Sequence, residues 1–417
     1  MKVLYLYMFP LWGNGSGAWL RRLIEQLSTS PRTKKKFKAY IIAPESHKFA
    51  YATIRKPAGI DEAVFVGNPS LPGARSFTNW SGREHVENFN HYLKETTAVV
   101  EKFKPDLIHV FHTAFLPSVG NIISDMYGIP IVITTHGSDL YYLKEDKRWR
   151  RQIRHSSLNA KYITANSTFT RRWYIEMFGK DLALKMRTIP AGVTNKIDFK
   201  QDVSWIDKQY KFKYDKMVLF TGRLIKHKGA EYLAKAAKDI KAEVFILGDG
   251  PERPYLEELI KKYKLDNVHM GGFFSGRNTP KINDFYKRAD IYVAPSVWKE
   301  PLGMVVLEAM VYGTPVIVTR QGGVTSIVKD GVNGLFVRPR NSKEIAQKVN
   351  RLLADDKLRE KMSKNAYESV LTKFSWDKVA QRFFNLYLRS IPKPKKSNTT
   401  LTKPNRLANP TLKLQIK

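Results

Sequence analysis

The chain of 417 residues contains no cysteine. This absence excludes a disulfide-stapled fold, a cysteine-ligated zinc or iron–sulfur site and a cysteine nucleophile. Acidic residues are also few, 38 against 71 lysines and arginines, which gives a formal net charge of +33. An excess of positive charge predicts an anionic partner, such as a nucleotide, a nucleic acid or an acidic membrane surface.

Long apolar runs are missing as well. No segment approaches the ~20 apolar residues that are needed to cross a bilayer. The apolar stretch from Met1 to Tyr7 is followed by Pro10 and a glycine-rich turn, so it lacks the length and the cleavage site of a signal peptide. We therefore expect a cytoplasmic protein, either free or peripheral at the inner face of the membrane.

The apolar content of 43% and the aromatic content of 12% indicate a folded chain. Short apolar runs alternate with helix-length amphipathic segments, which predicts an α/β fold with parallel sheets covered by helices. We expect two doubly wound domains that face a cleft, at residues 1–200 and 215–375. A helix at 376–390 can pack back on the first domain, and the basic segment 391–417 is expected to be disordered. The expected strands are Val3–Tyr7, Ala39–Ala43, Leu107–Val110, Ile131–Thr134, Tyr162–Ala165, Met217–Thr221, Glu243–Leu247, Val268–Met270, Ile291–Ala294, Pro315–Thr319 and Leu335–Val337.

Lysines and arginines are dense in two runs, residues 32–38 and 144–154. In the second run, Trp149 and Ile153 are four residues apart, so a helix places them on one face beside several arginines. Such a face is suited to an anionic membrane surface. The alternative is a solvated helix face whose two apolar side chains are buried.

The most informative segment runs from Pro295 to Met310 and follows an expected strand. Pro301 permits a helix to begin, and the helix is then apolar on every side except at Glu308, which indicates burial. A buried carboxylate requires hydrogen-bond donors, and the vicinal hydroxyls of a ribose would satisfy both of its oxygens. A structural glutamate that caps a neighbouring loop is the alternative.

Glu300 lies in the loop directly before this helix. The backbone N–H groups near Leu302, Gly303 and Met304 are at the helix start, where they can bind the oxygens of a ligand.

The segment from Gly222 to Gly229 follows the strand that opens the second domain. It places Arg223 and Lys228 at the carboxyl end of a strand and beside a helix start, an arrangement that can hold a diphosphate. No two aspartates are spaced as D-x-D, so we expect neither a metal nor another cofactor. A basic loop without a ligand is the alternative.

Three strand-end features carry weaker signals. Gly15 and Gly17 allow the backbone to approach a phosphate, although Ala18 stands where the dinucleotide fingerprint has its third glycine. Gly248 belongs to a similar turn. His136 directly follows an expected strand and is a candidate site residue, although a lone histidine is more often structural.

Together these motifs resemble the retaining nucleotide-sugar glycosyltransferases of family 4, also called glycosyl transferases group 1, which have the two-domain GT-B fold of Rossmann-like domains. The resemblance covers most of the first 390 residues and is strongest between residues 217 and 337. Its most specific feature is the pair Glu300 and Glu308 with seven residues between them, followed by Gly222-Arg223 through Lys228.

The resemblance implies a role for each matching residue. Glu300 contacts the donor sugar, Glu308 holds the ribose and His136 lies beside the transferred sugar. Arg223 and Lys228 bind the diphosphate. The implied catalytic residues are Glu300, His136, Arg223 and Lys228, and the implied donor-binding set adds Gly15, Gly17, Gly222, Gly248, Leu302, Gly303, Met304 and Glu308.

The expected reaction is therefore transfer of a hexose-type sugar from a UDP or GDP sugar to a hydroxyl, with retention at the anomeric carbon. A lipid-linked or cell-envelope glycan is the favoured acceptor, and a soluble glucan or sucrose-type synthase is the alternative. Pro301, Ser326 and Ala191 depart from the family pattern, which leaves the sugar open. No nucleic acid is expected, because the charge is spread over both domains and no nucleic-acid-binding signature is present.

Overall fold

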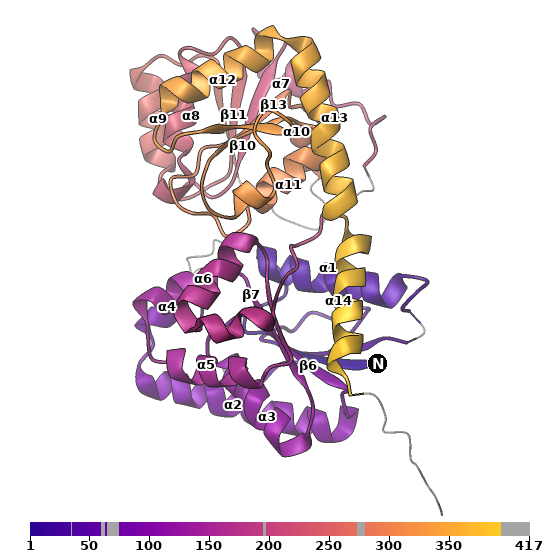
Figure 1. The fold of residues 1–417 in the computed structure, drawn as a ribbon. Helices are drawn as coiled ribbons and strands as arrows, with labels where there is room; N and C mark the ends of the chain where they lie inside the picture. Colours follow the sequence, from indigo (N-terminus) through magenta and orange to yellow (C-terminus); the bar gives the residue numbers. More distant parts are fainter. Residues whose placement is uncertain (35, 60–62, 65–74, 195–196, 273–279, 393–417) are drawn as a thin grey trace, which may run out of the picture.

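The computed structural model describes residues 1–34, 36–59, 63–64, 75–194, 197–272 and 280–392. The chain forms two α/β domains, each built on a parallel sheet, and Figure 1 shows one domain above the other. The expected fold class is confirmed, because parallel strands alternate with helices in both domains. The basic tail after residue 392 lies outside the described residues.

The first domain contains a seven-stranded sheet in the order β3-β2-β1-β6-β7-β8-β9, in which neighbouring strands are parallel. The strands that the sequence predicts here agree with the observed ones to within one residue at each end, whereas the short edge strands β3 and β9 were missed because three residues show no period. The strands are β1 (Lys2–Leu6), β2 (Lys38–Ile42), β3 (Thr53–Arg55), β6 (Leu107–Phe111), β7 (Ile131–Thr135), β8 (Tyr162–Ala165) and β9 (Met186–Thr188), and a separate pair is formed by β4 (Ala63–Val64) and β5 (Arg75–Ser76).

Helices cover both faces of this sheet, because the strand order reverses between β1 and β6 and crossover connections are right-handed. On one face, α1 (Gly15–Thr29) packs against α14 (Trp376–Ser390), and on the other, α3 (Leu116–Tyr127) packs between α2 (Gly82–Phe103) and α5 (Arg150–Asn159). The remaining elements are α4 (Ser138–Glu145), α6 (Thr168–Phe178), and the 3-10 turns η1 (Phe77–Asn79) and η2 (Lys180–Leu184).

The second domain has a six-stranded parallel sheet in the order β12-β11-β10-β13-β14-β15. Its strands are β10 (Met217–Thr221), β11 (Glu243–Leu247), β12 (Val268–Gly271), β13 (Ile291–Ala294), β14 (Val316–Thr319) and β15 (Gly334–Val337). One core joins the sheet to α8 (Ala230–Ala237), α9 (Arg253–Lys262) and α12 (Ser342–Ala354), and the opposite face is covered by α10 (Pro280–Arg288), α11 (Met304–Val311) and α13 (Asp356–Lys373). The shorter elements are α7 (Trp205–Tyr210), η3 (Lys226–Lys228) and η4 (Gly322–Ser326).

The chain crosses between the domains twice, and the two crossings lie side by side. The Val193 N–H donates to the Phe374 carbonyl at 2.8 Å, and the Trp376 N–H donates back to the Val193 carbonyl at 3.3 Å. Gly192 packs on the Trp376 indole, where a Cβ would lie 2.5 Å from the ring. Beyond this point α14 runs along the first domain (Figure 1), and its Tyr387 hydroxyl lies 2.6 Å from Nδ1 of the buried His109.

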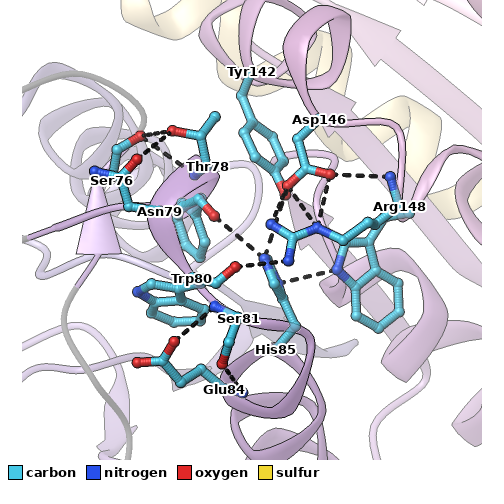
Figure 2. Close-up of polar contacts among 12 residues, drawn as sticks. Ser76, Thr78, Asn79, Trp80, Ser81, Glu84, His85, Tyr142, Asp146 and Arg148 are labelled. Atoms are coloured by element: carbon cyan, nitrogen blue, oxygen red, sulfur yellow. Dashed lines mark hydrogen bonds and ion pairs between the residues drawn. The ribbon is translucent and has the colours of Figure 1, made fainter.

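The basic run at 144–154 matches the buried-anchor alternative. Ile153 is fully buried, and the Trp149 indole donates to His85 Nδ1 at 3.1 Å. Figure 2 shows the Arg148 guanidinium between the Asp146 carboxylate and the Trp80 carbonyl, to which it donates at 2.6 Å. The two apolar side chains and Arg148 therefore contact the domain itself, whereas Arg151 is exposed, and contact of this run with a membrane stays a prediction. Among the described residues, no helix combines the length and the apolar character that a membrane span requires.

Candidate active site

The carboxyl ends of the two sheets face each other across the domain boundary. The loops that follow β7 and β8 in the first domain contact the loops that follow β13 and β14 in the second. At one contact, Gly137 has a φ of 92°, and a Cβ there would lie 2.4 Å from Pro301 Cβ. This approach places His136, next to Gly137, close to the Glu300 loop.

Glu300 and Lys228 form an ion pair in a pocket at the ends of β10 and β13. Lys228 Nζ lies 2.6 Å from Glu300 Oε1, and the Ser296 hydroxyl donates to the same oxygen at 2.9 Å. Burial by itself raises the pKa of the Glu300 carboxyl, but the Lys228 charge and these hydrogen bonds together lower it. Glu300 is therefore held as a carboxylate. The pocket is lined by Thr221, Lys228, Ser296, Glu300, Gly303 and Thr319 together with apolar side chains.

Glycine backbone geometry brings these two loops together. Gly229 ends η3 with a φ of 69°, and a Cβ at this position would lie only 2.2 Å from the Pro295 carbonyl oxygen. The Val297 N–H donates to the His227 carbonyl at 2.9 Å, which joins the two loops again. Only glycine permits this close approach at this φ. Because Gly229 directly follows Lys228, the contact brings Lys228 close to Glu300.

Arg223 follows β10 on the same edge of the sheet, behind Gly222. Burial lowers the pKa of its guanidinium, and the Glu300 charge opposes this effect. Gly248 lies across from Gly222 at the end of β11, where a Cβ would lie 1.9 Å from the Gly222 carbonyl oxygen. The backbones of these two strand-end turns are therefore in direct contact.

Glu308 lies on α11 and belongs to a buried hydroxyl network. The Tyr286 hydroxyl donates to Glu308 Oε2 at 2.9 Å, and it lies 2.6 Å from the Thr221 hydroxyl, which lines the pocket. Burial raises the pKa of the Glu308 carboxyl, although the hydrogen bond from Tyr286 opposes this shift. A partly buried carboxylate with its pKa raised is typical of a residue that is retained for binding rather than for stability.

We expect Glu308→Gln to make the protein more stable at pH 8 than the wild type, with a smaller gain at pH 4. Because the folded-state pKa is above the ordinary value of about 4.3, the folded chain binds more protons than the unfolded chain between the two values, and stability falls as the pH rises through this window. Glutamine does not titrate, so the variant does not lose this stability as the pH rises. Thermal melts at both pH values measure the difference, because a stability change of 1 kcal/mol shifts the melting temperature by about 2–4 °C. Glu258→Gln, at an exposed position on α9, should have no such effect. An equal shift in the melting temperature of Glu308→Gln at both pH values would contradict a raised pKa of Glu308.

The remaining expected donor-binding residues lie at two helix starts. Gly303 precedes α11 with a φ of 90° and packs against Val324, while the Leu302 side chain is buried. In the first domain, the exposed Gly15 begins α1, and the Gly17 N–H donates to the Asn14 side chain at 2.7 Å. Met304 is the first residue of α11.

His136 lies in a buried cluster that the sequence revealed only in part. Burial lowers the pKa of its imidazole well below the ordinary range, the adjacent His112 lowers it further, and Asp139 opposes both. The two imidazole rings are 4.2 Å apart between centroids, and the His112 backbone adopts a φ of 73°. His136 is therefore held neutral at the domain boundary.

Asp139 is a site residue that sequence reasoning missed. Its fully buried carboxylate accepts N–H groups from Thr113 at 2.9 Å and from Gly137 at 2.7 Å, as well as from His136 and Leu140. It thereby joins the loop after β6 to the loop after β7. The sequence signal that could have found it is its position directly after His136 and Gly137, because an aspartate in the first turn of a helix often accepts hydrogen bonds from nearby backbone N–H groups.

The chain matches two family models that together span both domains. One is described as Glycosyltransferase Family 4 and covers residues 15–195, and the other is described as Glycosyl transferases group 1 and covers residues 203–369. The chain belongs to the group 1 and family 4 glycosyltransferases. Its first domain thus matches one model and its second domain the other.

Curated relatives and solved structures agree with this membership. An uncharacterized glycosyltransferase of Methanocaldococcus jannaschii is 41% identical over 196 residues, which are 46% of this chain and about half, 48%, of that relative. A second from the same organism is 28% identical over 289 residues, covering 69% of this chain and 77% of the relative. HepE of Anabaena in complex with UDP has a TM-score of 0.72 at 22% identity, covering 93% of this chain and 100% of that one. Sucrose-phosphate synthase of Thermosynechococcus elongatus has a TM-score of 0.71 at 23% identity, with 93% and 98% covered. These structural likenesses confirm the GT-B fold of this glycosyltransferase.

Proposed function

We propose that this glycosyltransferase moves a hexose-type sugar from a nucleoside diphosphate sugar to a hydroxyl acceptor, with retention at the anomeric carbon. The observation that carries the proposal is the ion pair between Lys228 and the buried Glu300, 2.6 Å apart at the carboxyl ends of the strands. In open α/β sheets this edge is where ligands bind. HepE of Anabaena, which shares the fold, is described in complex with UDP and with UDP-glucose, which supports this donor class.

The proposed mechanism assigns charge neutralisation to the second domain. As the bond between the anomeric carbon and the diphosphate breaks, negative charge develops on the departing oxygen. Lys228 and Arg223, together with the backbone N–H groups at the start of α11, would stabilise that charge in a site from which water is excluded. The proton of the acceptor hydroxyl passes to the departing diphosphate on the same face of the sugar.

The other side chains orient the donor. Glu308, with Tyr286 behind it, would accept the ribose hydroxyls, and the Glu300 carboxylate would accept hydroxyls of the sugar. The neutral His136 on the first domain would contact the same sugar from across the boundary. A hydroxyl acceptor, lipid-linked or soluble, would enter along the first domain.

Calorimetric titration with UDP, GDP and their hexose conjugates tests the proposal. We expect one nucleoside diphosphate to bind with a Kd in the micromolar range. The double change Arg223→Ala with Lys228→Ala should weaken binding by at least tenfold, because two partly buried cations are removed. Equal affinity in both proteins would refute the diphosphate assignment. A chain that binds neither diphosphate but binds duplex DNA with a steep salt dependence would refute the proposed function.

A further inference from the structure

The loop that carries Glu300 is held by the first domain on both sides of this residue. Before it, the Tyr141 hydroxyl donates to the Lys299 carbonyl at 2.9 Å. After it, the Thr170 hydroxyl donates to the Pro301 carbonyl at 3.3 Å, and the Ser167 hydroxyl donates to the same oxygen. The backbone on either side of a proposed catalytic carboxylate is therefore fixed by the opposite domain.

An aromatic stack crosses the domain boundary at the same place. The Tyr141 ring of α4 lies 4.7 Å from the Trp298 ring, with 22° between their planes, and Trp298 stacks in turn on His227 at 5.3 Å. On the first-domain side, Trp173 of α6 packs edge-on against Tyr141 at 4.6 Å. Offset and edge-on aromatic pairs stabilise a contact beyond the area they bury.

The stack also lies beside the cation of the site. Lys228 Nζ lies 5.9 Å from the centroid of the Trp298 ring, on the second domain. Tyr141 thus contacts both the ring next to Lys228 and the carbonyl next to Glu300. The second domain supplies Lys228 and Ser296 to the Glu300 carboxylate and also holds the Glu300 carbonyl through the Gly323 N–H at 2.6 Å. The first domain adds hydrogen bonds to the carbonyls of the residues before and after Glu300.

We propose that Tyr141 is a positioning residue, which couples contact between the domains to the placement of Glu300. The inference rests on the proposed function, because it takes Glu300 as the residue that contacts the donor sugar. Tyr141 touches neither the diphosphate site nor the ribose site, both of which belong to the second domain. Its loss should therefore lower turnover while donor binding is retained.

Two substitutions at Tyr141 separate its contacts. Tyr141→Ala removes the stack and the hydrogen bond, and we expect a 10- to 100-fold fall in kcat for donor hydrolysis, since ~1 Å of misplacement can reduce a rate about 10²-fold. Tyr141→Phe keeps the stack, and a loss of about two- to tenfold is expected for one exposed hydrogen bond. The Kd for UDP, measured by calorimetry, should stay within about twofold in both variants.

Tyr127 provides the matched control in the same domain. It is an exposed tyrosine of α3 whose hydroxyl donates to Glu101 at 3.1 Å, away from the domain boundary. Tyr127→Ala and Tyr127→Phe should leave kcat unchanged. Small-angle scattering gives a second readout, because the radius of gyration should increase in Tyr141→Ala and not in Tyr127→Ala.

A double-mutant cycle with Trp298→Ala shows whether the stack acts as a unit. If it does, the double variant loses no more turnover than Tyr141→Ala alone, whereas independent effects multiply. Unchanged kcat in Tyr141→Ala, or equal losses of kcat and of UDP affinity, would overturn the positioning role while the proposed function stands. If the wild-type chain neither binds UDP or GDP nor hydrolyses a conjugate of either, the proposed function fails and the positioning role fails with it.

Discussion

Lys228→Ala is expected to lower the turnover of the sugar nucleotide by about 10²–10³-fold, the range found when one preorganised charge-stabilising group is removed from an active site. The Lys228 ammonium group lies 2.6 Å from the Glu300 carboxylate inside the pocket. Its charge acts there at a lower effective dielectric constant than in bulk water, so a dissolved cation does not replace it. Its removal also leaves the buried Glu300 carboxylate without a neighbouring cation, while the Ser296 hydroxyl still donates to it. The pKa of Glu300, now lowered chiefly by the Lys228 charge against the effect of burial, should then rise, and residual activity should increase with pH.

Steady-state hydrolysis and transfer assays over a pH series measure both effects. Lys226→Ala is the matched control, because Lys226 is an exposed lysine of the same turn, η3. Lys228→Arg keeps the charge and should retain more activity than Lys228→Ala. Turnover of Lys228→Ala within about threefold of the wild type would remove Lys228 from the proposed mechanism.

Asp139→Ala is expected to destabilise the first domain by about 3–5 kcal/mol, a large effect for one substitution. The change leaves several buried N–H groups without an acceptor, including those of Thr113 and Gly137, and each unsatisfied donor costs about 1–3 kcal/mol. Because the loops after β6 and β7 then separate, His136 loses its position and turnover falls as well.

Urea unfolding followed by circular dichroism measures the loss of stability, and donor hydrolysis at a temperature where the variant is folded measures the loss of turnover. Asp139→Asn keeps one carbonyl oxygen as an acceptor and should lie between the wild type and the alanine variant. Asp125 on α3 is an exposed control whose carboxylate accepts the Asn121 amide at 2.9 Å. A loss in Asp139→Ala no larger than in Asp125→Ala would contradict the structural role.

Much of the candidate site could be predicted because its residues lie in single strand–turn–helix units. Arg223 and Lys228 follow β10, and Glu300 follows β13, so the parallel sheet brings them to one edge. Glu308 was predictable for a different reason, since it is the one charged residue of an apolar helix. In both cases a short stretch of sequence contains the whole signal.

Other parts of the site had no local signal. Thr113 meets Asp139 across 26 positions of the sequence, and Tyr141 meets Trp298 across 157. The run around Trp149 shows the same limit. Its helical spacing is equally compatible with a membrane surface and with a protein core, and only the tertiary structure shows that Trp149 contacts His85 and Phe89 of α2.

The sequence by itself determined the class of fold, the strands of both sheets except β3 and β9 to within one residue, and the residue types at the strand ends that mark a glycosyltransferase. Hydrophobic periodicity and turn chemistry act over a few residues, so they can be read locally. Only the tertiary structure decided that Lys228 pairs with Glu300, that Asp139 joins two loops and that Tyr141 reaches the Glu300 loop. These contacts depend on how the sheet edges and the two domains are set against each other, and that arrangement results from the packing of the whole chain.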